Sequence, residues 1–383
     1  MLTSNINFLN FKTKKKSSVK KHIKSILKEN NQVILSLSKE YKNSFNKNSL
    51  KCFEKKLNYR IIGMGGSTLG AQAIYDFLKN KVKKNFSFID NLQGTQNKNL
   101  KKKINNIIIS KSGNTTETIV NANIFIKKND KNLFITENKK SYLRQLANKL
   151  KAEVIDHNNF IGGRYSVLSE VGMLPAELMG LNSKNFRQLN NLISNNFFMS
   201  ALISNVEATI SFIKSKKFNS VIINYDEQSV NLFNWYQQLM AESLGKNKIG
   251  LLPVMSLMPK DNHSVMQLYL DGCRNNFFTF FYVKEHNSSK IINSKILEEQ
   301  KFLKNKDINT IMYAQKRATE NVFRKKNIPF RSFEIKKRDE KTLGELFCFF
   351  ILETILIGKV LKINPFDQPA VELIKKETKK ILI

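Results

Sequence analysis

The sequence predicts an α/β protein with two tandem, doubly wound domains, in which parallel sheets are flanked by helices. Short apolar runs of strand length alternate with longer stretches of helical periodicity, a pattern that is typical of parallel strands joined by helices. The alternation occurs twice along the chain, and 383 residues are enough for two or three domains. We therefore expect two similar halves that pack tightly against each other.

The elements of the first half follow in chain order. Residues 1–57 are rich in Lys, Asn and Ser and contain helical patches such as Ile23–Leu27, which indicates an N-terminal helical extension. Residues 58–182 are expected to form the first domain. Its predicted strands are Tyr59–Ile62, Ile107–Ile109, Asn132–Thr136 and Ala152–Ile155, and its predicted helices are Ala71–Leu78, Glu117–Ile126 and Ser141–Leu150.

The second domain is expected over residues 183–362. Its predicted helical stretches are Ser183–Lys216, Gln228–Leu244, Ile308–Asn327 and Lys341–Leu361, and its predicted strands are Ser220–Tyr225, Phe277–Val283 and Phe330–Ile335. Residues 363–383 are expected to form a C-terminal tail with one more helix, roughly Ala370–Lys380.

The composition limits the class of protein. Hydrophobic residues make up 41% and charged residues 25% of the chain, so a sizeable core can form and wholesale disorder is excluded. Lys and Arg number 64 against 31 Asp and Glu, and a net charge of +33 would normally point to nucleic acid or an anionic membrane. The basic residues are nearly all Lys scattered among Asn and Ile, the residues that an AT-rich coding sequence over-supplies. We therefore expect no specific nucleic-acid partner, although the field would attract small anions to a cleft.

Cysteine usage and hydropathy indicate the compartment. The chain has three cysteines, Cys52, Cys273 and Cys348. They lie far apart without a CxxC pair, which argues against a zinc site and against a disulfide framework. The short run Lys14–Lys16 has no apolar stretch behind it, so no signal peptide is expected. The apolar segment Leu346–Ile357 is interrupted by Glu353 and is too short to span a bilayer. We expect a soluble, cytoplasmic protein without a membrane partner.

The first motif with chemical content is Gly63-Met64-Gly65-Gly66-Ser67-Thr68-Leu69-Gly70, which lies between a predicted strand and a predicted helix. Glycines let a backbone approach a ligand closely, and a helix N-terminus offers unpaired N–H groups. The spacing matches neither a Walker A loop nor a dinucleotide fingerprint. It indicates an anion-binding loop with Gly66 and Ser67 as candidate contacts. A tight turn without a ligand is the alternative.

The second motif is Ser110-Lys111-Ser112-Gly113-Asn114-Thr115-Thr116-Glu117-Thr118, again between a strand and a helix. Its hydroxyls, its lysine and the helix N-terminus form a dense set of donors for one phosphate group. A Ser/Thr helix cap, with Thr115 or Ser112 paired to a downstream acid, is the alternative. A cap needs only one hydroxyl, so the pattern favours phosphate binding.

These two segments together resemble the sugar isomerase (SIS) domain, which binds phosphorylated sugars. Four further segments, in chain order, are similar to the arginine, glutamate, histidine and lysine segments of the phosphoglucose isomerase family: Gly162–Ser169, Trp235–Lys246, Asp261–Gly272 and Asn364–Lys375. The resemblance runs from about Ile61 to Lys375 and covers most of the chain. Six such segments in sequence are highly specific.

The resemblance implies that the protein interconverts glucose 6-phosphate and fructose 6-phosphate, which requires a base and a group that stabilises an enediolate. Glu242 occupies the family's base position. Arg164 matches the arginine near the enediolate, where a permanently charged guanidinium stabilises negative charge. His263, which the neighbouring subunit supplies in the family, and Lys375 would open the sugar ring. Lys376 is the alternative to Lys375.

The resemblance also implies a substrate-binding set. Gln238 lies one helical turn before Glu242 and therefore shares its face, and the family uses it as a ligand contact. The phosphate would be held by Ser67, Ser110, Lys111, Ser112, Thr115 and Thr118. No metal and no organic cofactor are expected, because the carbonyl of the substrate acts as the electron sink. The family also implies a homodimer with shared active sites.

Plainer interpretations remain open at each position. Glu242 could lie on a solvated helix face, Arg164 could form a structural ion pair and His263 could be a hydrogen-bonded loop residue. Three alternative functions are a non-catalytic regulatory protein that binds phosphorylated sugars, a bifunctional phosphoglucose/phosphomannose isomerase, and a nucleic-acid binder supported by charge alone.

Overall fold

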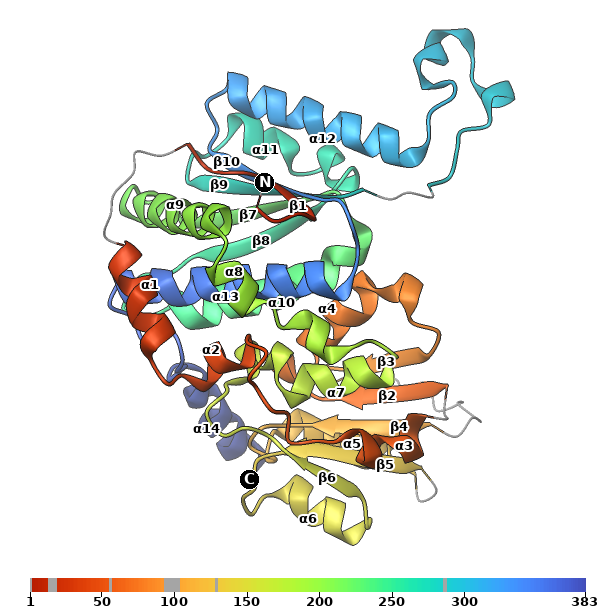
Figure 1. The fold of residues 1–383 in the computed structure, drawn as a ribbon, viewed down its shortest axis with the longest axis vertical. Helices are drawn as coiled ribbons and strands as arrows, with labels where there is room; N and C mark the ends of the chain where they lie inside the picture. The colour runs from red at the N-terminus through yellow and green to blue at the C-terminus, as the bar shows by residue number, and fades with distance from the viewer. Residues whose placement is uncertain (1, 13–18, 55–56, 93–103, 128–129, 285–287) are drawn as a thin grey trace.

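The computed structural model describes residues 2–12, 19–54, 57–92, 104–127, 130–284 and 288–383. Two five-stranded sheets lie one above the other along the long axis, with helices around and between them (Figure 1). Within each sheet the strands that the alternation predicted are parallel. The predicted α/β fold class is confirmed.

The first sheet has the strand order β3-β2-β4-β5-β6, and all of its neighbours are parallel. Its strands are β2 (Asn58–Ile62), β3 (Asn85–Ile89), β4 (Asn105–Ile109), β5 (Lys131–Thr136) and β6 (Glu153–Asp156). The central strand β4 is buried along its whole length, as expected for a parallel strand covered on both faces. The sequence analysis missed the edge strand β3.

Helices connect these strands and cover the first sheet (Figure 1). They are α4 (Leu69–Phe77), α5 (Thr116–Phe125), α6 (Tyr142–Lys149) and α7 (Glu170–Leu178). Since α4 follows β2 and α5 follows β4, both helices begin at the carboxyl edge of the sheet. That edge is where open α/β sheets bind their ligands.

The second sheet has the order β1-β10-β9-β7-β8. Its strands are β1 (Ile6–Leu9), β7 (Asn219–Asn224), β8 (Leu252–Leu257), β9 (Asn276–Val283) and β10 (Phe330–Ile335). The expected N-terminal extension is therefore not purely helical, because β1 joins this sheet antiparallel to β10. Ile6 is fully buried, and the partly buried Phe8 packs against Phe333 with ring centroids 4.5 Å apart, so the packing of these two side chains fixes the strand. The sequence analysis also missed β8.

The remaining helices belong to the N-terminal region, the second half and the C-terminus. They are α1 (Val19–Lys28), α2 (Gln32–Ser36), α3 (Lys47–Glu54), α8 (Leu189–Ile193), α9 (Asn196–Lys214), α10 (Val230–Leu244), α11 (Met266–Asp271), α12 (Ile308–Lys325), α13 (Glu340–Val360) and α14 (Val371–Leu382). By length and composition α9 could cross a membrane, and half of its apolar window is buried in the fold. The core helix of a soluble protein passes the same test.

A helical layer lies between the two sheets (Figure 1). Helix α10 contacts α4 from the first half and β8 and α13 from the second half. Helix α13 is buried continuously from Thr342 to Gly358, so it forms the centre of the shared core. This packing brings the side chains of α10 next to the loops that follow the first sheet.

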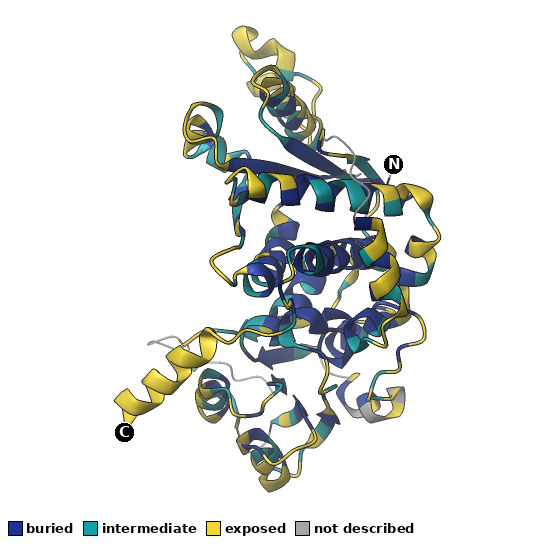
Figure 2. Cartoon of the chain, turned by 90° about the vertical axis from the view of Figure 1, so that its left-hand side faces the viewer, coloured by how far each residue is buried: buried dark blue, intermediate teal, exposed yellow. Residues whose placement is uncertain are grey.

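The C-terminal helix α14 contrasts with this core. None of its residues is buried, and Figure 2 shows it extending away from the body of the molecule. The expected C-terminal helix is therefore present, but in the single chain it packs against nothing that buries it.

Candidate active site

The two motif loops lie side by side at the carboxyl edge of the first sheet, because β2 and β4 are neighbours. Gly63, which follows β2, is in close contact with the end of β4. A Cβ at Gly63 would lie 2.8 Å from the carbonyl oxygen of Ile109 and 3.0 Å from the Cβ of Ser67. The residue after Ile109 is Ser110, so the first hydroxyl of each loop lies near this contact.

The hydroxyls of the second loop interact with one another and with the backbone of the loop. The side-chain oxygens of Ser110 and Thr115 are 2.9 Å apart, and the backbone N–H of Asn114 donates to Ser112 Oγ at 3.2 Å. Thr115 is the N-cap residue of α5, but its side chain makes no capping hydrogen bond. The cap interpretation therefore does not account for Thr115, and the first turn of α5 keeps donors for an anion.

Two further residues of this motif, Thr118 and Lys111, differ in their polar contacts. Thr118 is fully buried, and its Oγ1 has no partner among the described residues, which is an uncommon state for a buried hydroxyl. Lys111 donates to the carbonyl of Asn159 at 2.7 Å and lies 3.6 Å from Glu137 Oε1. Burial lowers the pKa of Lys111, and the charge of Glu137 partly opposes this shift.

One face of α10 carries the two polar residues expected there. Gln238 Nε2 donates to Glu242 Oε2 at 3.0 Å, as their spacing of one helical turn predicts. Gln238 also lies against the first motif loop, because a Cβ at Gly65 would lie 2.9 Å from Gln238 Nε2. Its Oε1 is buried without a partner in the described part of the chain. The Glu242 side chain is 23% exposed, so it remains accessible.

Arg164 lies in the 3-10 turn η3 (Gly163–Leu168) and is almost completely buried. Its Nη1 is 3.4 Å from Glu242 Oε1. Four hydrogen bonds hold the guanidinium, to Ser243 Oγ, Gln368 Oε1 and the carbonyls of Pro365 and Asp367. A guanidinium has five N–H groups, so one Nη1 hydrogen is left for the side of Glu242. Arg164 is thus both a structural anchor and the positive charge nearest to this carboxylate.

A very close backbone contact fixes the Arg164 turn against the first motif loop. A Cβ at Gly66 would lie only 2.1 Å from the carbonyl carbon of Gly163 and 2.5 Å from the backbone nitrogen of Arg164. Only glycine permits this approach. Trp235 of α10 donates from Nε1 to the carbonyl of Arg164 at 3.2 Å, so the loop, the turn and the helix form one rigid unit.

Comparison with known proteins matches residues 6–383 to the family model described as "Phosphoglucose isomerase". The chain belongs to the phosphoglucose isomerase family. It is 32% identical over 337 residues to the glucose-6-phosphate isomerase of Methanocaldococcus jannaschii, which covers 83% of this chain and 82% of that protein. It is 31% identical over 347 residues to the glucose-6-phosphate isomerase of Campylobacter jejuni, which covers 85% of both chains.

Solved structures show the same fold. A hypothetical protein from Thermus thermophilus superposes with a TM-score of 0.81 at 22% identity, covering 95% of this chain and 94% of that one. A glucose-6-phosphate isomerase from Chlamydia trachomatis superposes with a TM-score of 0.71 at 18% identity, covering 97% of this chain and 76% of that one. The phosphoglucose isomerase fold therefore extends over nearly the whole chain.

Two residues of the phosphoglucose isomerase pattern do not join this group in the single chain. His263 is exposed at the end of the turn η6 (Lys260–His263) after β8, at the second sheet. Lys375 lies on the protruding helix α14, where its Nζ donates to Glu372 at 2.6 Å. No interaction links either residue to Glu242 or Arg164 within the described ranges. The assignment of both residues as ring-opening groups stays a prediction.

The sequence analysis also missed neighbours of the predicted residues in the candidate site. Ser243, Lys246 and Gln368 surround Arg164 and Glu242, although the first two lie in the glutamate segment and the third in the lysine segment. The segments themselves were the available signal, but sequence spacing does not tell which side chains meet. Within the part of the chain that the structure describes, no three His, Cys, Asp or Glu residues gather as metal ligands would.

Proposed function

We propose that this protein is a glucose-6-phosphate isomerase, which interconverts glucose 6-phosphate and fructose 6-phosphate. Membership of the phosphoglucose isomerase family supports the proposal. The single structural observation that carries it is the position of Glu242. This carboxylate is accessible, lies between Arg164 and Gln238, and belongs to a helix that packs on the glycine loop beside the hydroxyl loop.

The two loops would bind the phosphate end of the sugar. Ser67, Ser110, Ser112 and Thr115 would donate hydrogen bonds together with the first turn of α5. The hydroxyl of Thr118 on the same helix has no partner among the described residues, but it is buried, so the loop would have to open for it to reach the phosphate. Lys111 would attract the phosphate by its positive charge rather than by direct contact, because its ammonium already contacts Asn159 and Glu137. Anchoring the phosphate would orient carbons one and two of the sugar against Glu242.

The proton transfer would then use groups of one chain. Glu242 would take a proton from one carbon and return it to its neighbour, and the enediolate formed between these steps would carry negative charge. Arg164 would stabilise that charge by its proximity without donating a proton, since its guanidinium stays protonated at all relevant pH values. The substrate's own carbonyl accepts the electrons, so the step needs no cofactor.

Ring opening would require His263 and Lys375. We propose that a second copy of the chain supplies His263, so that the protein works as a homodimer with shared active sites. The exposure of η6 and α14 supports this assembly, because both elements carry a predicted catalytic residue and leave it accessible. We also propose that the enzyme is cytoplasmic and acts in glycolysis and gluconeogenesis.

The base assignment is tested by Glu242→Gln. This variant should lose about 10²–10⁴-fold in turnover while still binding fructose 6-phosphate, because it removes the proton acceptor and keeps the side-chain shape. Conversion of fructose 6-phosphate in deuterated water should place label at carbon two with the unaltered protein only. Glu227→Gln, at an exposed position just before α10, is the matched control.

Two outcomes would redirect the proposal. If the unaltered protein binds fructose 6-phosphate without converting it, the regulatory sugar-binding function would replace the isomerase. If it also converts mannose 6-phosphate, the bifunctional activity would apply.

His263→Ala should slow a cyclic substrate more than an open-chain analogue, and equal losses would remove His263 from ring opening.

A further inference from the structure

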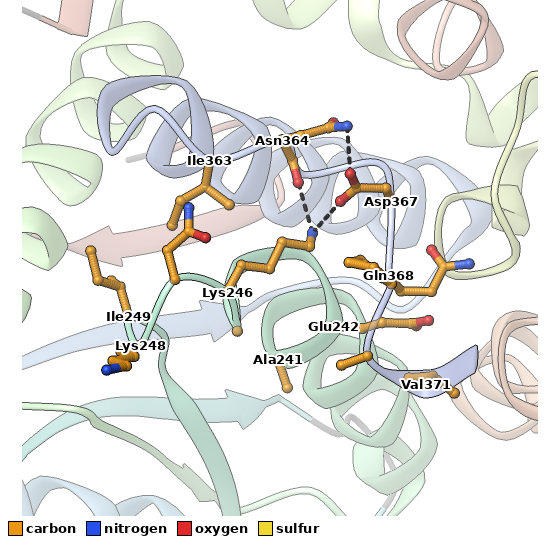
Figure 3. Close-up of a pocket in the computed structure, with 14 residues that line it drawn as sticks. Ala241, Glu242, Lys246, Lys248, Ile249, Ile363, Asn364, Asp367, Gln368 and Val371 are labelled. Atoms are coloured by element: carbon orange, nitrogen blue, oxygen red, sulfur yellow. Dashed lines mark hydrogen bonds and ion pairs between the residues drawn. The ribbon is translucent and has the colours of Figure 1, made fainter. Parts of the chain in front are cut away.

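A cavity of about 740 Å³ lies beside Glu242, on the side of α10 that faces the C-terminal segment. Its wall is formed by the end of α10, by the loop after it and by residues 363–371 (Figure 3). Of the residues in this wall, the proton transfer proposed above uses only Glu242. Lys246 lies in the middle of this wall, and its side chain reaches from the loop after α10 to the C-terminal segment.

Lys246 makes three polar contacts. Its Nζ donates to the carbonyl of Ser243 at 2.9 Å and to the carbonyl of Asn364 at 2.7 Å, and it lies 3.1 Å from Asp367 Oδ1. The side chain is only 12% exposed. An ammonium that is largely removed from water needs such partners, and its hydrogen bonds to them are strong because one partner is charged.

The segment that Lys246 holds is also held by Arg164 and Tyr165. Arg164 donates to the carbonyls of Pro365 and Asp367 and to the side chain of Gln368. Burial raises the pKa of Tyr165 to about 12, so its hydroxyl stays protonated and donates to the carbonyl of Pro365 at 3.0 Å. Two cations on different elements therefore fix a stretch of five residues, 364–368.

This stretch links the carboxylate to the C-terminal helix. Arg164 contacts Glu242 as well as the stretch, so a shift of the stretch would be transmitted to the carboxylate. Helix α14 begins at Val371, three residues after Gln368, and none of its residues is buried. Its direction is therefore set mainly by the chain segment that precedes it. Lys375 lies in the second turn of that helix.

We propose that Lys246 is a positioning residue that fixes residues 364–368 against α10, and thereby fixes both the Arg164–Glu242 pair and the direction in which α14 presents Lys375. The inference rests on the proposed isomerase function. It adds a role for a side chain that touches neither the phosphate loops nor the predicted reacting carbons.

The test is Lys246→Met, which keeps the aliphatic stem and removes the ammonium. Turnover should fall by about 10- to 100-fold, since a displacement of about 1 Å at reacting groups has effects of this size. KM should change little, because Ser67, Ser110 and Thr115 are not involved. Lys246→Arg should restore much of the turnover, since a guanidinium can still bridge Asp367 and a backbone carbonyl.

Lys84→Met is the matched control. Lys84 is likewise partly buried, and its Nζ donates to the backbone carbonyl of Leu178 at 2.8 Å, far from the candidate site. It should lower the melting temperature without a specific loss of turnover. A Lys246→Met protein that keeps normal turnover, or whose turnover falls only in proportion to its loss of folded protein, would overturn the proposal.

A double-mutant cycle gives the second readout. Asp367→Asn should reduce turnover less than Lys246→Met, because the carbonyls of Ser243 and Asn364 still hold the ammonium. Combined with Lys246→Met, it should have little further effect, since both changes remove the Lys246–Asp367 ion pair, while the amide keeps an oxygen for the hydrogen bond from Asn364 Nδ2. Fully additive losses of turnover would contradict the proposed positioning role of Lys246. Failure of the unaltered protein to convert fructose 6-phosphate would instead refute the proposed function, so the two failures are distinguishable.

Discussion

The contact between Gly66 and Gly163 makes the sharpest prediction about how the site is held together. In Gly66→Ala, the new methyl group would lie 2.1 Å from the carbonyl carbon of Gly163 and 2.3 Å from its oxygen. Ordinary van der Waals contact begins at 3.4 Å, so the loop and the Arg164 turn would have to separate by roughly 1.3 Å. Both neighbours are backbone atoms, which cannot rotate away as a flexible side chain can.

The cost of this separation should appear in both stability and activity. Inserting a methyl group into a packed contact of this kind typically costs about 1–3 kcal/mol in the free energy of unfolding. A displacement of about 1 Å between the phosphate loop and Arg164 should lower turnover by about 100-fold. Denaturant unfolding measures the first effect. A coupled assay of fructose 6-phosphate conversion, run where the variant is fully folded, measures the second.

The same turn provides two controls. A Cβ at Gly162 would meet its nearest atom only at 4.0 Å, and a Cβ at Gly163 would lie 3.7 Å from the Cα of Gly66. Gly162→Ala and Gly163→Ala should therefore be tolerated, although they lie in the same glycine pair. If Gly66→Ala matched these variants in turnover and stability, the loop and the turn would not form the rigid unit inferred above.

Three further predictions concern buried groups. Thr118→Val should leave stability unchanged, because the hydroxyl has no partner to lose among the described residues, and should raise KM for the sugar phosphate; an unchanged KM would remove Thr118 from the binding site. Glu353→Gln should cost about 3–5 kcal/mol in denaturant unfolding, because it leaves Arg331 buried without its counter-ion; a loss well below this range would mean that Arg331 finds another partner. A thiol reagent at about pH 8 should label exposed Cys273 and spare Cys348, since burial raises the pKa of Cys348 to about 12 and the reactive thiolate forms only as the pH approaches that value. Peptide mapping that found modified Cys348 in the folded protein would contradict this.

The sequence predicted those strands whose signal is local. The run Ile107–Ile109 is apolar because β4 is covered on both faces, and this burial is readable from three residues. The strand β1 has no such signal, because its partner β10 lies more than 300 residues further along the chain (Ile6 pairs with Ile335). Its apolar side chains Ile6 and Phe8 indicate a strand only when the positions of β10 and α13 are known.

The candidate site likewise has parts that local sequence predicts and parts that it does not. The loops and the helix face were predictable, because spacing alone places Gln238 and Glu242 on one side of α10. The contacts of Lys246 were not, because Lys246 and Asn364 meet across 118 positions of sequence. Contacts of this kind are decided by how α10 packs against the C-terminal segment, and no periodicity encodes that packing.

In the proposed mechanism, the way Glu242 is held would let one carboxylate both accept and return a proton. One of its oxygens faces the charge of Arg164 and the other accepts from the neutral amide of Gln238, so the carboxylate is fixed without being enclosed. Arg164 in turn has four of its donors committed to Ser243 and the C-terminal segment, so it cannot follow the substrate. A cation that is fixed before the substrate arrives does not have to reorganise as negative charge develops, and such preorganisation is the main source of electrostatic stabilisation in enzymes. In the proposed mechanism, the buried contacts of Arg164 are therefore part of the chemistry, because they hold its charge beside the carboxylate that would transfer the proton.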